Sequence, residues 1–198
     1  MNDMIGKSVY DIDTPALVID LDAMERNIRG MADFFRDRPA KLRPHAKTHK
    51  TPELAQMQLD AGAIGITCAK LGEAEVMADA GIRDLLVANE VIGAQKIARL
   101  VEVARKSDII VAVDSAENAQ DISDAALAAG VRVRVLIEVD VGQNRCGVKP
   151  GAPAVRLAQE VLKLRGLLFK GVMGYEGHIV LNPDREARES ECQKSNHS

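Results

Sequence analysis

The sequence has no tryptophan and only three phenylalanines and two tyrosines among its 198 residues. Single-stranded nucleic acids bind proteins by stacking on aromatic rings, so this chain offers little of that surface. Its formal net charge of −3 excludes a bulk electrostatic attraction to nucleic acids or anionic lipids. No apolar run approaches the roughly 20 residues that span a bilayer. We therefore expect neither a nucleic-acid partner nor a membrane partner.

Cysteine is also scarce. Its three positions, Cys68, Cys146 and Cys192, show no CxxC spacing. The first ten residues are of mixed polarity and lack the apolar core of a secretory signal. An odd cysteine count without an export signal is typical of reduced thiols in the cytoplasm. P-loop, HExxH and spaced cysteine–histidine zinc patterns are missing too, so spacing predicts no metal site in this chain.

Short apolar runs alternate with helical patterns along the chain. The predicted strands are residues 15–20, 41–47, 65–70, 84–89, 108–114, 131–140 and 168–175. From residue 41 onward, strand and helix patterns follow one another at short intervals. This alternation predicts a parallel sheet covered by helices, and both a doubly wound sheet and a (β/α) barrel fit it.

One face of segment 131–140 is charged, since Arg132, Arg134, Glu138 and Asp140 alternate along it. A polar inner face favours a barrel whose mouth holds a ligand. We count six βα-type strands after residues 15–20, whereas a (β/α)8 TIM-type barrel takes roughly 250 residues. We therefore expect an incomplete α/β barrel over residues 1–181, ending about two strands early. Residues 182–198 are expected to form a polar, poorly ordered tail.

Local signals predict where the helices begin and end. Asp22, with Glu25 three positions later, is typical of an N-cap with a capping box. Ser115 predicts a second N-cap. Gly81 and Gly130 follow helical patterns and predict C-terminal caps.

The stretch RPHAKTHK at residues 43–50 is the most informative. Side chains alternate along a strand, so Arg43, His45 and Lys47 are expected on one side of it. A lysine amine must be neutral to attack an aldehyde, and the neighbouring Arg43 and His45 would lower its pKa. Lys47 is therefore our candidate for a Schiff base, with an ordinary surface lysine as the alternative.

Two further clusters follow the ends of predicted strands. Arg145 lies between Gly142 and Gly147 in the loop after segment 131–140 and could donate to an anionic oxygen, or be a solvated turn residue. Tyr175 ends the last predicted strand and His178 follows it. They could supply a stacking surface and an acid/base group, or form an ordinary polar strand end.

In combination, these stretches resemble the fold-type III pyridoxal-phosphate enzymes, the alanine racemase-like barrel group, and especially its D-threonine aldolase and D-serine dehydratase-like branch. The likeness is carried by DTPALVID at 13–20, RPHAKTHK at 43–50, CAKLGEAEV at 68–76, EVDVGQNRCG at 138–147 and YEGH at 175–178.

The resemblance implies a role for each matching residue. Lys47 matches the lysine that holds pyridoxal 5'-phosphate covalently, and His45 lies beside it at the cofactor. Arg145 matches the arginine that donates to the phenolic oxygen of the cofactor. Tyr175 occupies the position against the pyridine ring. His178 matches a candidate acid/base on the second face.

Two parts of the family pattern have no counterpart in this sequence. They are the glycine-rich loop that cradles the cofactor phosphate and the C-terminal β-domain that carries the divalent-metal ligands. The resemblance therefore implies Mn²⁺ or Mg²⁺, and a homodimer, only for a full-length parent. The predicted strand at 15–20, which packs on that domain in the family, would be unpaired. We expect this chain alone to bind the cofactor weakly and to be inactive.

The activity that the resemblance implies is that of a lyase on D-β-hydroxy-α-amino acids. Retro-aldol cleavage of D-threonine or 3-hydroxy-D-aspartate would give glycine and an aldehyde. Three alternatives stay open: a D-serine or 3-hydroxyaspartate dehydratase, a non-catalytic pyridoxal-phosphate barrel, and an aldolase that uses Lys47 without a cofactor.

Overall fold

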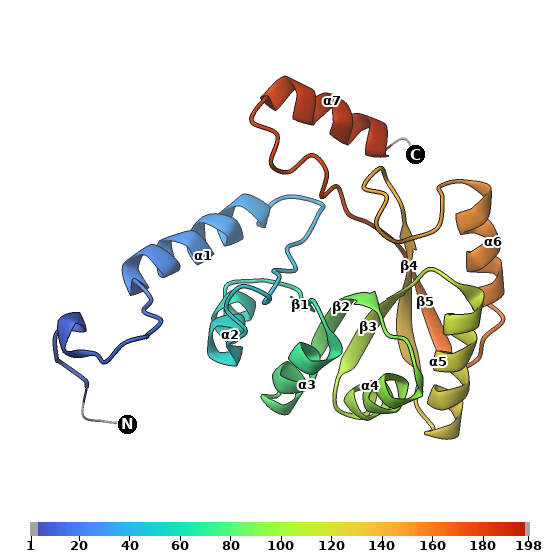
Figure 1. Cartoon of the computed structure of the whole chain (residues 1–198), viewed down its shortest axis with the longest axis horizontal. Coiled ribbons are helices and arrows are strands. Elements are labelled where there is room, and N and C mark those ends of the chain that lie inside the picture. The colour runs from blue at the N-terminus through green and yellow to red at the C-terminus, as the bar shows by residue number, and fades with distance from the viewer. Residues whose placement is uncertain (1–3, 197–198) are drawn as a thin grey trace.

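A parallel sheet of five strands organises the computed structural model, which describes residues 4–196. The strands pair in chain order and are β1 (Ile66–Cys68), β2 (Asp84–Glu90), β3 (Asp108–Val113), β4 (Val133–Val139) and β5 (Leu167–Gly174). Helices α2 (Pro52–Asp60), α3 (Leu71–Asp79), α4 (Ala94–Lys106), α5 (Ala116–Ala128) and α6 (Ala152–Val161) alternate with them and lie along one face of the sheet (Figure 1).

The strand order distinguishes between the two folds that the sequence allowed. A doubly wound sheet reverses its strand order and carries helices on both faces, whereas a barrel wall keeps chain order with helices outside. The order β1-β2-β3-β4-β5 is that of a barrel wall. The prediction of an α/β fold with a partial (β/α) barrel is confirmed.

The hydrophobic core lies between the outer face of this wall and the helices. In β4, Val133, Val135 and Ile137 are fully buried in this core, and Arg134 and Glu138 alternate with them toward the inner face. Fully burying one such side chain contributes about 1.5–3 kcal/mol. The period-2 alternation thus fixes an apolar outer face and a polar inner face, as the charge pattern of this segment predicted.

Most of the local helix signals act as predicted. The Ser115 side chain accepts a hydrogen bond from the Asn118 amide at 3.2 Å and caps α5. Gly81 and Gly130 follow α3 and α5 with φ of 89° and 68°, the left-handed conformation that glycine adopts without a steric penalty.

The first long helix begins earlier than predicted. Helix α1 spans Leu21–Phe35, and its N-cap is Asp20, whose carboxylate accepts from the Ala23 amide at 2.9 Å. Asp22 is therefore a residue of the first turn, where a negative charge also favours the helix dipole. A cap further upstream satisfies these amides because residue 20 has extended backbone and residue 22 is already helical.

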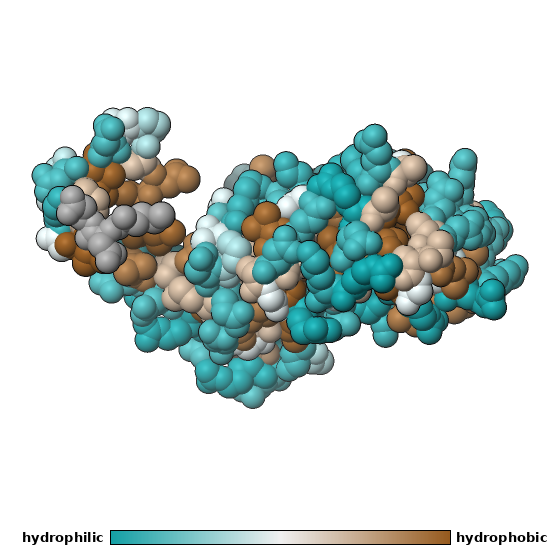
Figure 2. Space-filling view, turned by 90° about the horizontal axis from the view of Figure 1, so that it is seen from below, coloured by the Kyte–Doolittle hydropathy of each residue, from teal (hydrophilic) through white to brown (hydrophobic). Residues whose placement is uncertain are grey.

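Two predicted strands are not strands of the sheet. Residues 41–47 contribute a single bridge, His45 to Thr67, beside β1. Residues 15–20 form no strand because no neighbouring segment of the described chain offers them a ladder. Figure 2 shows hydrophobic side chains gathered on this N-terminal arm, where Leu17, Val18 and Ile19 are exposed.

The remaining elements flank the wall. A short 3-10 helix, η1 (Val9–Asp11), precedes α1, and helix α7 (Arg185–Asn196) forms within the segment expected to be a polar tail. Figure 1 shows α1 and α7 set apart from the five helices that cover the sheet. Among the helices of residues 4–196, none has the length and apolar character needed to span a membrane.

Candidate active site

The predicted functional residues follow the carboxyl ends of the strands, the end where barrel ligands bind. His45 and Lys47 lie beside β1 at one edge of the sheet. Arg145 lies in the loop after β4, and Tyr175 and His178 follow β5 at the other edge. The fold thus brings the residues together in two groups, one at each edge of a five-stranded wall.

Lys47 stands in a turn that directly follows the bridge at His45. The turn is closed by a hydrogen bond from the Lys50 amide to the Ala46 carbonyl, 2.7 Å long. Ala46 is buried in the core, whereas the Lys47 side chain is exposed. Within residues 4–196 its amine has no ion-pair partner, so it is available to a ligand.

His45 anchors the same turn. Its Nδ1 accepts a hydrogen bond from the Lys47 amide at 3.2 Å. Burial lowers the pKa of His45, and the positive charge of Lys47 lowers it further. The imidazole is therefore neutral near pH 7 and serves as an acceptor beside the lysine.

A buried carboxylate fixes the far end of this turn. Glu73, on α3, accepts hydrogen bonds from the Lys50 amine and from the Ala69 amide, the latter at 2.7 Å. Burial alone would raise the pKa of Glu73, but the hydrogen bond from Lys50 and the other contacts leave it lowered. Lys50, the residue directly after His49 in RPHAKTHK, is thus a structural anchor.

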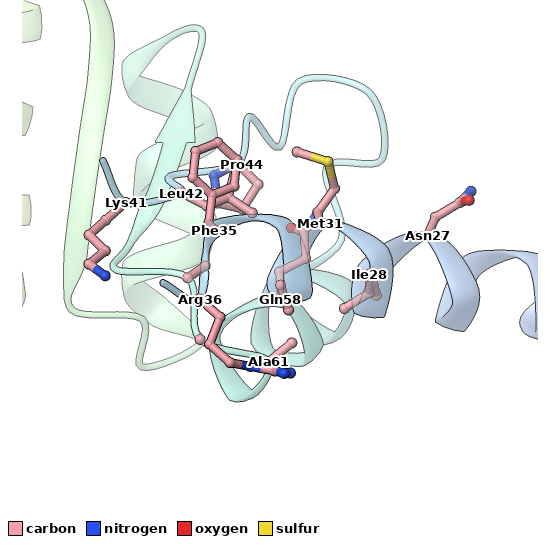
Figure 3. A pocket seen from close by; sticks show the side chains of 13 residues that line it. Asn27, Ile28, Met31, Phe35, Arg36, Lys41, Leu42, Pro44, Gln58 and Ala61 are labelled. Atoms are coloured by element: carbon pink, nitrogen blue, oxygen red, sulfur yellow. The ribbon is translucent and has the colours of Figure 1, made fainter. Parts of the chain in front are cut away.

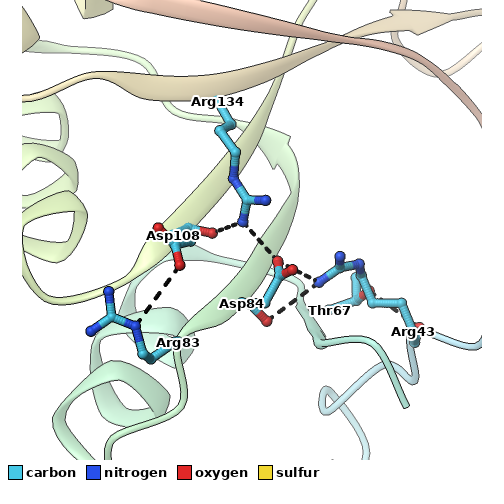
Figure 4. A network of polar contacts seen from close by, with 6 residues as sticks. All are labelled: Arg43, Thr67, Arg83, Asp84, Asp108 and Arg134. Carbon is cyan, nitrogen blue, oxygen red and sulfur yellow. Dashed lines mark hydrogen bonds and ion pairs between the residues drawn. The ribbon is translucent and has the colours of Figure 1, made fainter. Parts of the chain in front are cut away.

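Arg43 does not act on Lys47, contrary to the sequence-based hypothesis. It lies at the amino end of the wall, where its guanidinium bonds the Asp84 carboxylate at 3.0 Å (Figure 4). Arg134 bonds the same oxygen at 2.7 Å. Three residues separate Arg43 from Lys47, and this short segment runs from the amino end of the wall, where Arg43 binds Asp84, toward the carboxyl end, where Lys47 lies.

Gly65 makes this amino-end network possible. A Cβ atom at this position would lie 1.9 Å from the Arg43 guanidinium and 2.6 Å from the Asp84 carbonyl. Only glycine leaves room for the arginine to cross to β2. The charged side chains on the inner face at this end of the wall are therefore paired with one another.

The loop after β4 folds back on its own strand and presents Arg145. The Val148 amide bonds the Glu138 carbonyl at 3.0 Å, and the Asp140 amide bonds the Val148 carbonyl at 2.9 Å. Gly147 adopts φ of +96°, and a Cβ there would lie 2.8 Å from the Asp140 nitrogen. The two-way backbone pairing leaves the loop little freedom.

The Asp140 carboxylate accepts hydrogen bonds from several residues of this loop. It accepts from the Lys149 amine at 2.7 Å and from the Asn144 and Gly142 amides at 2.9 and 3.1 Å. The Lys149 hydrogen bond, together with those two amides, lowers the pKa of Asp140 to about 2.

Arg145, Tyr175 and His178 meet across the ends of β4 and β5. The Arg145 guanidinium lies 5.2 Å from the centre of the Tyr175 ring, a cation–π contact. A Cβ at Gly142 would lie only 3.0 Å from His178 Nε2, so the imidazole rests against this loop. The structure therefore gathers the guanidinium, the phenol and the imidazole that the sequence singled out.

Sequence reasoning missed a buried acidic cluster beneath Arg145. Glu138 is 3% exposed, and Glu90 is half-buried beside it. Burial raises the pKa of Glu90, and the negative charges of Glu138 and Asp114 raise it further. The charged alternation of segment 131–140 signalled an inner position for Glu138, but not its burial.

Cys146 completes the cluster as a thiol. Its sulfur lies 2.9 Å from Glu138 Oε1, and burial and that carboxylate raise its pKa to about 11. Ligand atoms of Glu90, Glu138 and Cys146 lie within 4.8 Å of one another. The guanidinium of Arg145, 3.7 Å from Glu138, already supplies positive charge there, so we assign the cluster no metal.

The most apolar cavity lies away from these groups. It encloses about 520 Å³ between α1 and α2, and Ile28, Met31, Phe35, Leu42 and Pro44 line it (Figure 3). Leu42 and Pro44 are on the outer face of the segment whose inner face carries His45. The cavity thus lies between outer helices, and Lys47 is not among the residues that line it.

The parallel strands form the wall of a (β/α) barrel, and the Lys47 amine and the Arg145 guanidinium lie at its carboxyl end. Enzymes with this fold carry their active sites at that end, so fold and site together are those of a (β/α)-barrel enzyme. Residues 19–196 match the family model described as alanine racemase, N-terminal domain, and the chain belongs to this family. The family resemblance drawn from the motifs is confirmed.

Within this family, the chain is similar to individual proteins that are named for their activity. The chain is 43% identical over 190 residues to the D-threonine aldolase of Arthrobacter sp, which covers 96% of this chain and 50% of that protein. It is 36% identical to the D-threo-3-hydroxyaspartate dehydratase of Delftia sp. (strain HT23), covering 86% and 45%. The crystal structure of D-threonine aldolase from Filomicrobium marinum superposes with a TM-score of 0.93 at 44% identity, covering 96% and 51%. The chain thus spans about half the length of the relatives it matches.

Proposed function

We propose that this chain forms the pyridoxal 5'-phosphate-binding barrel of a lyase that cleaves D-β-hydroxy-α-amino acids. The preferred reaction is a retro-aldol cleavage of D-threonine or 3-hydroxy-D-aspartate to glycine and an aldehyde. The observation that carries the proposal is Lys47, an exposed amine without an ion pair among the described residues. It follows a strand-edge bridge at the carboxyl end of a barrel whose family and relatives include aldolases of this kind.

The donor chemistry of the described residues fits this cofactor. Lys47 offers an amine for the aldehyde, Arg145 a donor for the phenolic oxygen, and Tyr175 an aromatic face for the ring. Glu138 Oε2 and Glu90 Oε1 are buried without hydrogen-bond partners, so the inner face at this end keeps unused polar capacity. Bound there, the cofactor would draw electrons from the bond that breaks at the substrate α-carbon.

The chain's own residues would prepare and complete the cleavage. His45, neutral and bonded to the Lys47 amide, holds the turn that presents the amine. In retro-aldol cleavage the β-hydroxyl loses its proton while the Cα–Cβ bond breaks and an aldehyde leaves. A proton then returns to Cα. His178, exposed against Gly142, is the candidate to move one of these protons.

A dehydratase is the second candidate, because a relative of that activity is 36% identical. In that reaction the Cα–H bond breaks and the β-hydroxyl leaves as water, giving a 2-oxo acid and ammonia after hydrolysis. The same amine and guanidinium would serve both reactions. They differ in the group that activates the β-hydroxyl.

Further proposals concern the whole protein. For a longer chain we propose a homodimer, a divalent Mn²⁺ or Mg²⁺ that activates the β-hydroxyl, and a cytoplasmic location. For this chain we propose that residues 1–181 form the barrel unit and that residues 182–198 lie outside it.

Borohydride trapping tests the proposal. The chain is incubated with pyridoxal phosphate, reduced and digested, and its peptides are weighed. We expect a pyridoxyl adduct on Lys47, and none at that position in Lys47→Arg, which keeps the charge but loses the primary amine. Trapping of a substrate-sized adduct on Lys47 without the cofactor would instead favour a cofactor-free aldolase. Adducts spread over exposed lysines at equal yield would refute the proposal.

A further inference from the structure

Glu138 is the most deeply buried carboxylate at the carboxyl end of the wall. It belongs to β4, and its side chain points to the inner face. Its Oε1 lies 2.9 Å from the Cys146 sulfur and 3.7 Å from an Arg145 nitrogen. An isolated buried carboxylate is strongly disfavoured unless a cation or hydrogen bonds compensate it. Arg145 is the cation that the structure brings to it.

The backbone around Arg145 is fixed independently of this pair. The Gly147 amide bonds the Asp114 carboxylate at 3.1 Å, and Val148 pairs with β4. The long arginine side chain, however, contacts the Glu138 carboxylate below it, the Tyr175 ring beside it and the neighbouring Cys146 thiol. Without the carboxylate, the half-exposed guanidinium would be free to turn into solvent.

A second acid, the half-buried Glu90, lies beside Glu138 in this cluster. Burial raises the pKa of Glu90, and the charges of Glu138 and Asp114 add to this, so Glu90 takes up a proton more readily than an ordinary glutamate. The pKa of the Arg145 guanidinium is raised, first by the hydrogen bond with Cys146 and further by Glu138.

We propose that Glu138 is the positioning residue for Arg145: its buried carboxylate holds the guanidinium over Tyr175, where it can donate to the cofactor. The proposal rests on the proposed function for the identity of that ligand. The placement of Arg145 itself is a property of the chain without any ligand. Glu138 touches neither substrate nor cofactor in this account.

Arginine-selective modification by phenylglyoxal, read by peptide mass, tests the placement without cofactor. The reagent attacks the neutral guanidine, so a nearby carboxylate protects it. In Glu138→Gln we expect Arg145 to react about fivefold faster than in the unmodified chain, equivalent to under one pKa unit. Glu138→Asp, which keeps the charge, should restore much of the protection. Glu73→Gln is the matched control, because it removes a buried carboxylate paired with Lys50 and leaves Arg145 untouched.

The unmodified chain gives a second comparison, which holds even if Glu138→Gln fails to fold. Arg145 should react several-fold more slowly than Arg26, an exposed arginine without an ion pair among the described residues. Equal rates for these two arginines, or an Arg145 rate in folded Glu138→Gln equal to that of the unmodified chain, would overturn the proposal.

A spectroscopic readout links the placement to the ligand. With pyridoxal phosphate added, the pH midpoint of the visible band should shift by about one unit in Glu138→Gln and by a similar amount in Arg145→Gln. The double variant should add little, because both changes remove the same donor. An unchanged midpoint in Glu138→Gln would refute positioning. Absence of any Lys47-dependent band would instead refute the proposed function, while the modification rates still decide the placement of Arg145.

Discussion

The amino-end network predicts a specific loss of stability in Asp84→Asn. One carboxylate oxygen accepts from Arg43 at 3.0 Å and from Arg134 at 2.7 Å. The two arginine side chains are only 16% and 21% exposed, so each would keep a partly buried charge without its partner. The amide retains one acceptor but loses the negative charge that both guanidinium groups share.

The magnitude follows from these contacts. Hydrogen bonds to charged groups contribute about 1.5–3 kcal/mol each. Solvent screens part of this because the Asp84 side chain is 36% exposed. We therefore expect Asp84→Asn to lower the free energy of unfolding by about 2 kcal/mol at pH 7, measured by urea denaturation.

Asp108→Asn is the matched control. Asp108 opens the next strand as Asp84 opens β2, but its carboxylate is 62% exposed and its ion pair with Arg83 is 3.8 Å long. Arg134 uses the Asp108 backbone carbonyl, which the substitution keeps. We expect a loss below about 0.5 kcal/mol. Equal losses in the two variants would refute the reasoning that the buried arginines depend on Asp84.

The stability that the Asp84 carboxylate contributes should depend on pH. Burial alone would raise the pKa of Asp84, but the hydrogen bonds from Arg43 and Arg134 outweigh it and leave it lowered. A lowered pKa stabilises the fold above the ordinary aspartate value, and this contribution is lost as the pH falls through the lowered value. The difference between the unmodified chain and Asp84→Asn should therefore shrink in acid.

Two further predictions concern the loop after β4. Gly147→Ala should lower the free energy of unfolding by about 2 kcal/mol. Gly130→Ala is the control, because nothing obstructs a Cβ there, and it should cost about 1 kcal/mol. Equal losses would show that the contact between a Cβ at position 147 and the Asp140 backbone is unimportant. The Asp140 carboxylate should titrate by NMR near its pKa of about 2. The loop should therefore stay closed at pH 4 and open as the pH falls toward 2. A titration midpoint near 3.8 would contradict the conclusion that Lys149 stabilises the charged Asp140 carboxylate.

The wall of the barrel could be predicted because its signals are local. Apolar alternation in segment 131–140 sets β4, and single residues such as Ser115 and Gly130 set the ends of helix α5. The strand predicted at 15–20 failed because a strand is defined by its neighbour. An apolar run alone does not show whether a ladder partner exists.

In the candidate site too, features with a local signal were predicted and features that depend on distant residues were not. Lys47, Arg145 and Tyr175 were identified from motifs, since Arg145 and Tyr175 follow the ends of strands and Lys47 follows the bridge at His45. The partner of Arg43 was missed because Asp84 lies 41 residues away in the chain. The burial of Glu138 and Glu90 was missed for the same reason, because it arises from loops that fold over the end of the wall.

The most direct test of the central claim is a visible absorbance titration of the chain with pyridoxal phosphate. Lys47→Ala is compared with Lys70→Ala, which removes another exposed lysine at the same end of the wall. The account predicts a visible band in the unmodified chain and in Lys70→Ala, and none in Lys47→Ala. A band of equal strength in Lys47→Ala, or no band in the unmodified chain, would contradict the claim that Lys47 holds the cofactor.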